Sequence, residues 1–309
     1  MQKADPAALR PLDGWVTAII LACCVIWGIN QTAIKIANAG IPPFQQAGLR
    51  SLFAGLLVFA WCMFRGIALF ERDGSLKAGI VIGLSFAANF MMVYPGLQLT
   101  SASRAVLFIY SMPFFVAIGA HYLIPGDRIT PTKLAGLIAA FAGLAVALGD
   151  GLFSTSQPQG ALLGDLLCLG SAIGWAVATL MMRTTSLRYI RPEKTLFYQL
   201  AISAPLLLLV SFVSGEGPAS FDDPRVVLGF AYTVVIVAFI TYVIWVWLLS
   251  RHPASVVASF TFLSPVFGVL AGALLLDERI TMRTWLSLAF VVTGIILINK
   301  PTAARSPKP

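Results

Sequence analysis

Long apolar stretches alternate with short polar connectors along the whole chain. Stretches of about 20 residues are long enough to cross the hydrocarbon layer of a bilayer as α-helices. Turns rich in Gly and Pro, such as residues 40–43 and 125–127, mark the connectors. Ten helices are predicted, over residues 15–37, 44–64, 77–98, 102–124, 133–149, 160–182, 195–213, 226–249, 254–276 and 284–299. The pattern indicates an all-α polytopic membrane protein with ten transmembrane helices.

The composition agrees with a lipid environment. Of the 309 residues, 58% are hydrophobic and 11% are charged, whereas a soluble domain carries roughly 25% charged residues. A soluble enzyme, a nucleic-acid-binding protein and a secreted disulfide scaffold are therefore excluded. The first apolar run extends from Trp15 to Ala37, which is too long for a cleaved signal core, so we expect a retained helix. The four cysteines lie in apolar runs without metal-ligand spacing and are expected to be core thiols.

Basic residues are distributed unevenly between the connectors. If the N-terminus is cytoplasmic, 15 of the 21 lysines and arginines fall on the inner side and five on the outer side, while Arg50 lies inside a span. Cytoplasmic loops of membrane proteins carry such an excess. We therefore expect a multi-pass protein of the bacterial inner membrane with both termini in the cytoplasm.

The second half of the chain repeats residues of the first half at an offset of 151 or 152 positions. The matching positions are Ser103 and Ser255, Pro113 and Pro265, and the turns Asp127-Arg128-Ile129-Thr130 and Glu278-Arg279-Ile280-Thr281. An odd number of spans in each half turns the second copy upside down in the membrane. The sequence thus predicts two inverted five-helix repeats. The loops at Gly126 and Glu278, although equivalent, should face opposite sides.

These repeats set the expected organisation of the chain. It consists of a cytoplasmic N-terminal segment at 1–14, a first repeat at 15–149, a connector at 150–159, a second repeat at 160–299 and a cytoplasmic tail at 300–309. Small-residue spacings such as Gly160-x-x-x-Gly164 allow helices to approach closely. We expect them to pack helices within the monomer.

The paired turns and prolines, together with Gly160-Ala-Leu-Leu-Gly164-Asp165 leading to Gly174-Trp175-Ala176, resemble the drug/metabolite transporter superfamily. The resemblance is to its ten-helix form with two EamA-type repeats and covers almost the entire chain. Within the superfamily the chain looks like bacterial amino-acid exporters of the YddG type. The resemblance implies a central cavity between two inverted halves, alternating access, and efflux of small amphipathic solutes.

Aromatic and polar residues inside the spans are the candidates for binding a solute. A polar helix face in lipid must contact protein or water, because hydrocarbon offers no hydrogen-bond partner. In the first span, Trp27 shares one face with Gln31 and Lys35, and Trp175 begins the same pattern in the sixth. The candidate substrate-binding residues are Trp27, Asn30, Arg50, Asn89, Tyr94, Tyr110, Trp175, Tyr242, Trp245, Thr261 and Ser264.

Several of these positions have alternative interpretations. Arg50 can meet a substrate carboxylate, pair with a helix end or snorkel to the interface. Pro113 and Pro265 are interpreted as hinges because they occupy equivalent places in the two halves, although a static kink is the alternative. Asp165, near a span end, and His121 are interpreted as structural, with proton coupling by Asp165 as the alternative.

The sequence therefore predicts a transporter that exports amino acids, favouring aromatic and other bulky apolar ones, by alternating access. A transporter of sugars or nucleotide sugars, or a passive facilitator, is the alternative. No metal-binding His pair, nucleophile motif or phosphate-binding loop is present in the sequence, so we expect neither an enzyme nor a cofactor. The expected partners are a small-molecule substrate and the lipid bilayer, without nucleic acid or an obligatory protein partner.

Overall fold

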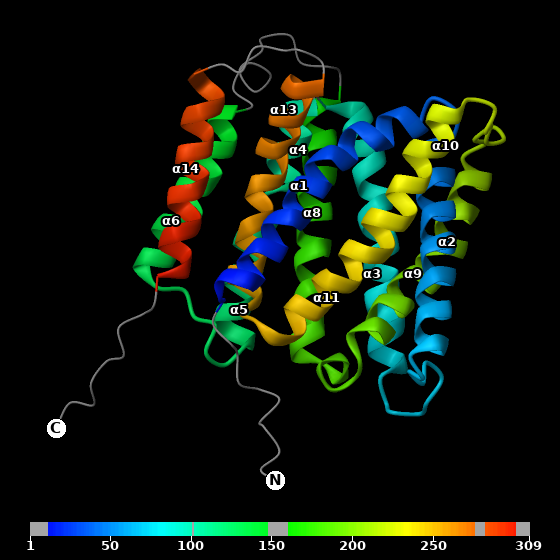
Figure 1. Ribbon diagram of the computed structural model, residues 1–309, viewed down its shortest axis with the longest axis horizontal. Coiled ribbons are helices and arrows are strands. Elements are labelled where there is room, and N and C mark those ends of the chain that lie inside the picture. Colours follow the sequence, from blue (N-terminus) through cyan, green and yellow to red (C-terminus); the bar gives the residue numbers. More distant parts are fainter. Residues whose placement is uncertain (1–11, 101, 148–159, 276–281, 301–309) are drawn as a thin grey trace.

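A computed structural model describes residues 12–100, 102–147, 160–275 and 282–300, and these residues form helices, turns and bends without a strand. The first half contains α1 (Gly14–Ala37), α2 (Pro43–Phe64), α3 (Leu76–Leu99), α4 (Ala102–Ile109), α5 (Met112–Leu123) and α6 (Pro131–Ala147). The helices run up and down through one bundle (Figure 1). The all-helical prediction is confirmed.

The second half follows the same order. It contains α8 (Ala161–Thr184), the 3₁₀ turn η1 (Ser186–Tyr189), α9 (Pro192–Val213), α10 (Pro224–Ala231), the π-helix η2 (Tyr232–Thr241), α11 (Tyr242–Arg251), α12 (Ala254–Ser259), the 3₁₀ turn η3 (Phe260–Phe262), α13 (Leu263–Leu275) and α14 (Met282–Asn299). Each half thus supplies five consecutive spans, in which α4–α5, α10–η2–α11 and α12–η3–α13 each make a single span.

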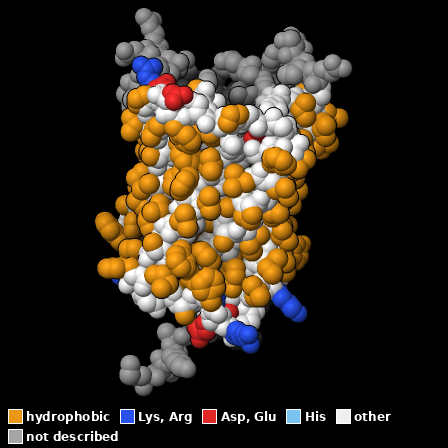
Figure 2. All heavy atoms as spheres, turned by 90° about the vertical axis from the view of Figure 1, so that its right-hand side faces the viewer, with side chains coloured by type: hydrophobic (Ala, Val, Ile, Leu, Met, Phe, Trp, Pro, Cys, Tyr) orange, Lys and Arg blue, Asp and Glu red, His pale blue; other side chains and the backbone are white. Residues whose placement is uncertain are grey.

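The surface of the bundle suits a bilayer. Within the described residues, seven helices are long and apolar enough to cross a membrane, and three shorter apolar helices lie at the predicted fifth, ninth and tenth spans. Large hydrophobic side chains such as Leu56, Leu209 and Ile296 are more than half exposed. Figure 2 shows hydrophobic side chains across the middle of one face, with acidic and basic ones at its two ends. This distribution is the inverse of that in a water-soluble protein.

Helix contacts relate the two halves by a pseudo-two-fold arrangement. The main pairs are α1 with α13, α2 with α9, α3 with α8, α3 with α9, and α6 with α14. When each span is exchanged with its counterpart, the α2–α9 and α6–α14 pairs map onto themselves. In Figure 1, α1 rises from the lower end of the bundle whereas its counterpart α8 descends from the upper end. The halves therefore run in opposite senses, as the odd span number requires.

Close backbone contacts at the α6–α14 pair repeat this symmetry. A Cβ atom on Gly136 would lie 2.6 Å from the carbonyl oxygen of Gly294, and one on Gly143 would lie 2.8 Å from that of Ser287. A shift of 151 positions converts each of these pairs into the other. Because no Cβ fits there, the two helices pack backbone to backbone within the monomer.

The fourth and ninth spans are interrupted at equivalent places rather than bent by a mid-helix proline. The fourth span breaks after α4, and Pro113 is the second residue of α5. The ninth passes through the η3 turn, and Pro265 is the third residue of α13. Proline fits in a first helical turn, because the N–H it lacks would have no intrahelical partner there. The hinge role of both prolines stays a prediction.

The domain boundaries likewise stay a prediction, because the connector at 150–159, the outermost residues 1–11 and 301–309 and the loop with Glu278 lie outside the described residues. The start of α1 and the end of α14 both lie at the lower end of the bundle in Figure 1. The α5–α6 turn lies at this end, and the α9–α10 loop lies at the opposite end.

Cysteine labelling is expected to reveal which end is cytoplasmic. All four native cysteines are buried, so their removal leaves a background for single exposed thiols. With Pro125→Cys in the α5–α6 turn, an impermeant thiol reagent should label the protein only after intact cells are permeabilised, because the excess of basic residues lies at this end. With Pro218→Cys in the α9–α10 loop, labelling should occur in intact cells. Equal labelling of both positions from outside would contradict this orientation.

Candidate substrate-binding site

Two tryptophans from different halves meet in the interior. Trp27 on α1 and Trp245 on α11 lie edge to face, with ring centroids 5.0 Å apart, and both are buried. The indole Nε1 of Trp27 donates to Thr241 Oγ1 at 2.8 Å. The structure therefore brings together two predicted site residues, and it fixes one of them by a hydrogen bond that the sequence did not predict.

The partner of Trp27 lies at the end of the π-helix. Thr241 closes η2, and its hydroxyl also donates to the Val237 carbonyl at 2.7 Å. At the other end of η2, Tyr232 donates through its hydroxyl to the Ile26 carbonyl at 2.9 Å. These bonds hold the π-helix against α1. π-helical turns are rare and are frequent at functional sites.

A ladder of aromatic rings runs along α3. We call it the aromatic band, and its residues are Phe44, Phe86, Phe90, Tyr94 and Tyr242. Ring centroids are 6.1 Å apart for Tyr242 and Phe86, 5.1 Å for Phe86 and Phe90, 6.2 Å for Phe90 and Tyr94, and 5.6 Å for Tyr94 and Phe44. The band joins α2, α3 and α11, and within α11 it comes within one turn of Trp245.

Arg50 lies against this band. Its side chain is buried, at 4% exposure, and its Cζ lies 4.5 Å from the centroid of the Phe90 ring. Among the described residues, no hydrogen-bond partner is present for its Nε or Nη2 atoms. Such burial rules out snorkelling to the interface in this conformation. Buried N–H groups of a cation that lack hydrogen-bond partners are costly.

A second aromatic pair flanks the band on α8. Trp175 lies edge to face with Tyr110, which sits at the break between α4 and α5, with centroids 6.5 Å apart. One turn before Trp175, the Ser171 carbonyl accepts a hydrogen bond of 2.9 Å from Asn89 Nδ2 on α3. Asn89 therefore connects the α3 ladder to the helix that carries Trp175.

The remaining predicted residues lie near α13. Asn30 and Ser264 are both buried, and Asn30 Oδ1 has no hydrogen-bond partner among the described residues. Thr261 is also buried, but its hydroxyl donates to the Ala258 carbonyl at 2.7 Å, within its own span. Thr261 therefore has a local structural partner, whereas Asn30 offers an unused acceptor.

The rings pack against each other in this conformation. Trp27, Tyr94, Tyr110 and Trp245 are all buried. A hollow of about 640 Å³ lies at the lower end of the bundle, and a groove of about 420 Å³ lies between α2 and α9. None of the predicted substrate-binding residues lines either of these two spaces.

Polar contacts tie the halves together at the end where α8 begins. Asp165 on α8 forms an ion pair with Arg104 on α4 and accepts a hydrogen bond of 2.7 Å from Thr100 Oγ1. Arg104 and Thr100 belong to the first half and Asp165 to the second. The contacts agree with the structural interpretation of Asp165.

At the lower end, the carboxylates of Asp127 and Asp73 also connect the two halves. Asp127 is 2.6 Å from Lys133 Nζ, and its carboxylate accepts from the backbone N–H of Ser255 at 3.1 Å and from the Ser255 hydroxyl. Asp73 is 2.8 Å from Lys194 Nζ. Burial alone would raise the pKa of Asp73, but hydrogen bonds from Lys194 and Ser75 outweigh it and lower the pKa to about 2.

Sequence reasoning missed three residues of the aromatic band. Phe86 and Phe90 precede Tyr94 by eight and four positions, the same spacing that identified the polar face of the first span. That signal was present in the sequence. Phe44 and Thr241 had no such signal, because only tertiary packing brings them to Tyr94 and Trp27.

Comparisons with known proteins place the fold. The profile of the EamA-like transporter family matches residues 14–149 and 162–300. A solved crystal structure superposes with a TM-score of 0.79 at 20% identity, covering 93% of this chain and 96% of the other, which shows the fold alone.

Two sequence relatives match this chain over most of their length. The uncharacterized transporter YvbV of Bacillus subtilis is 31% identical, over 96% of both chains. A probable amino-acid metabolite efflux pump of Escherichia coli is 28% identical, over 92% of this chain and 94% of the relative. Because the family profile matches both halves and the relatives are matched almost from end to end, the chain belongs to the EamA-like transporter family and is a membrane transporter.

Proposed function

We propose that the protein exports amino acids, with aromatic and other bulky apolar ones favoured. The observation that carries the proposal is Arg50, a buried guanidinium over the Phe90 ring whose Nε and Nη2 atoms have no partner among the described residues. A guanidinium binds a carboxylate through two parallel hydrogen bonds, and it does so most strongly where water is excluded. Arg50 is therefore the proposed anchor for the substrate carboxylate.

The aromatic band supplies the complementary surface for the side chain. Rings on α3 and α11 offer edge-to-face and stacking contacts that do not require one fixed shape. At the start of α2, the carboxylate of Glu216 in the α9–α10 loop accepts hydrogen bonds from the backbone N–H groups of Phe44 and Gln45 at 3.0 and 2.9 Å. A cationic polyamine would find few acids here, and a sugar phosphate would require several cations.

In the proposed transport cycle, the polar contacts between the two halves open alternately at the two ends of the bundle. Asp165 joins the halves at one end and Asp127 joins them at the other. The interruptions before Pro113 and Pro265 let the fourth and ninth spans change their angle without breaking a continuous helix. When one set of contacts opens and the other remains closed, a solute at Arg50 gains access to one side only.

Growth and flux measurements test this function. Cells that overproduce the protein should tolerate toxic analogues of aromatic amino acids better than cells with an empty vector. Purified protein in liposomes should release labelled phenylalanine with saturation and with acceleration by unlabelled phenylalanine on the opposite side. Flux without saturation or counterflow would indicate a facilitator. Unchanged tolerance together with no movement of any amino acid would overturn the proposal, and export of the YddG type stays a prediction until then.

A further inference from the structure

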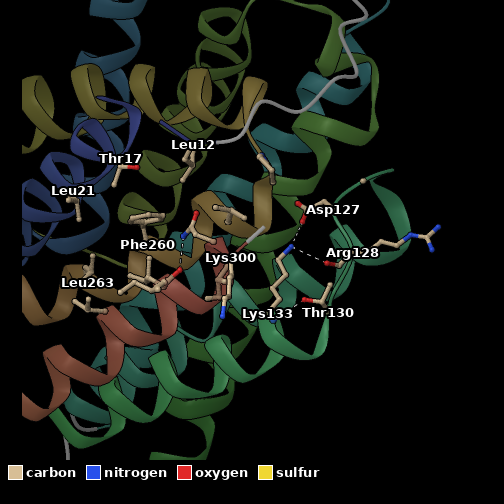
Figure 3. Close-up of a pocket in the computed structure, with 18 residues that line it drawn as sticks. Leu12, Thr17, Leu21, Asp127, Arg128, Thr130, Lys133, Phe260, Leu263 and Lys300 are labelled. Carbon is tan, nitrogen blue, oxygen red and sulfur yellow. Dashed lines mark hydrogen bonds and ion pairs between the residues drawn. The ribbon is translucent and has the colours of Figure 1, made fainter. Parts of the chain in front are cut away.

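The hollow of about 640 Å³ at the lower end has a different chemistry from the aromatic band (Figure 3). Its volume is in the range of sites that hold small organic ligands. Its walls come from α1, the α5–α6 turn, α12–α13 and α14. The apolar part of the lining consists of Leu12, Leu21, Val256, Phe260, Leu263, Val292, Ile295, Ile296 and Ile298.

The remaining lining is mostly basic and polar. Arg128, Lys133 and Lys300 contribute three cations, against the single carboxylate of Asp127. Lys133 points to Asp127 and also donates to the Arg128 carbonyl at 3.4 Å, whereas Arg128 extends outward from the rim (Figure 3). Asp127 is already engaged by Lys133 and Ser255. The rim therefore carries an excess of positive charge.

The hollow lies where the bundle meets the edge of the membrane. It is bounded by the start of α1 and the end of α14, and Ile296 on its α14 wall is 62% exposed on the lipid-facing surface. An acyl chain can therefore reach the apolar floor from the bilayer while its headgroup stays at the basic rim. Basic residues at the cytoplasmic surface attract anionic lipids by about 1 kcal/mol each, roughly fivefold in affinity.

We propose that this hollow binds an anionic phospholipid of the cytoplasmic leaflet. The headgroup phosphate contacts Lys300 and a reoriented Arg128, and one acyl chain lies along Phe260 and Ile296. None of the proposed amino-acid site residues lines the hollow, so the proposal does not depend on which solute is transported.

Lipid titration of the purified full chain tests the proposal. Delipidated protein is titrated with dioleoylphosphatidylglycerol or dioleoylphosphatidylcholine, and bound lipid is counted by native mass spectrometry. Phosphatidylglycerol should bind at least about tenfold more tightly. The double variant Arg128→Gln/Lys300→Gln should lose this preference. Arg188→Gln/Arg251→Gln, which removes two exposed arginines from the same end outside the hollow, should keep it.

A variant with a larger side chain in the apolar part of the hollow tests whether an acyl chain binds there. Ile296→Trp should weaken binding of both lipids several-fold, whereas Ile138→Trp, at an exposed position of α6 outside the hollow, should not. Equal binding of the two lipids by the natural chain, or an equal loss in the arginine control, would overturn the proposal. Displacement of phosphatidylglycerol by inorganic phosphate, with no effect of Ile296→Trp, would assign the rim to a soluble anion instead. Lipid binding that appears only after deletion of residues 2–10 would assign the hollow to the chain's own N-terminal segment.

Discussion

Replacing Arg50 by glutamine is expected to abolish export of phenylalanine and to weaken its binding by at least about 30-fold, or about 2 kcal/mol. The reason is that a buried charged partner of the substrate carboxylate would be lost. Phenethylamine, which has the aromatic ring and the ammonium group without the carboxylate, should bind the variant at least as tightly as the natural chain. Isothermal titration on purified protein measures both.

The same variant separates a ligand role from a structural one. Because Arg50 is buried over Phe90 and its Nε and Nη2 atoms have no hydrogen-bond partner among the described residues, its removal should leave the unfolding temperature of the ligand-free protein unchanged or raised. Arg65→Gln, at the end of α2 and outside the aromatic band, is the matched control and should keep both binding and transport. Loss of stability in Arg50→Gln with unchanged phenylalanine affinity would show that the arginine is structural.

Variants of the interrupted spans are expected to separate flux from binding. Pro113→Ala and Pro265→Ala should slow export while phenylalanine affinity stays within a few-fold, because both helices would continue through their interruptions and change angle less readily. Trp175→Ala and Tyr110→Ala should instead weaken binding by about 1–3 kcal/mol, the range for loss of a stacked ring. Paired binding and liposome flux assays measure the two effects.

Pro205→Ala is the control for this series, since Pro205 lies inside α9 on the membrane-facing groove and away from the aromatic band. It should preserve flux. Full flux in both hinge variants would remove the prolines from the mechanism, and undiminished binding in both aromatic variants would move the site elsewhere in the bundle.

The fold was predictable because its signals are local and repeated. Apolar run lengths located the spans, and the Ser–Pro–Arg-Ile-Thr series located the two halves. Whether the spans would bend or break at Pro113 and Pro265 could not be predicted, because a proline is compatible both with a kinked helix and with the start of a new one. The π-helix had no signal either, since an inserted helical residue leaves the apolar composition of η2 unchanged.

The candidate site was predictable residue by residue but not as an arrangement. Trp27 and Trp245 were both identified, yet their contact joins positions that are far apart in the chain. Asp165 was recognised as unusual, but its partner Arg104 was counted as an outer-loop charge, because only the packing of α4 on α8 brings the two together.

The helices of the two halves are related by a pseudo-two-fold arrangement, but the side chains at equivalent positions differ. Arg50 lies seven positions after Pro43, and the residue seven positions after the equivalent Pro192 is Gln199. The first half therefore offers a guanidinium at a position where the second half offers an amide. An amino acid has one carboxylate for the guanidinium and one side chain for the aromatic band, so it fits in one orientation. We therefore expect each chain to bind one solute molecule.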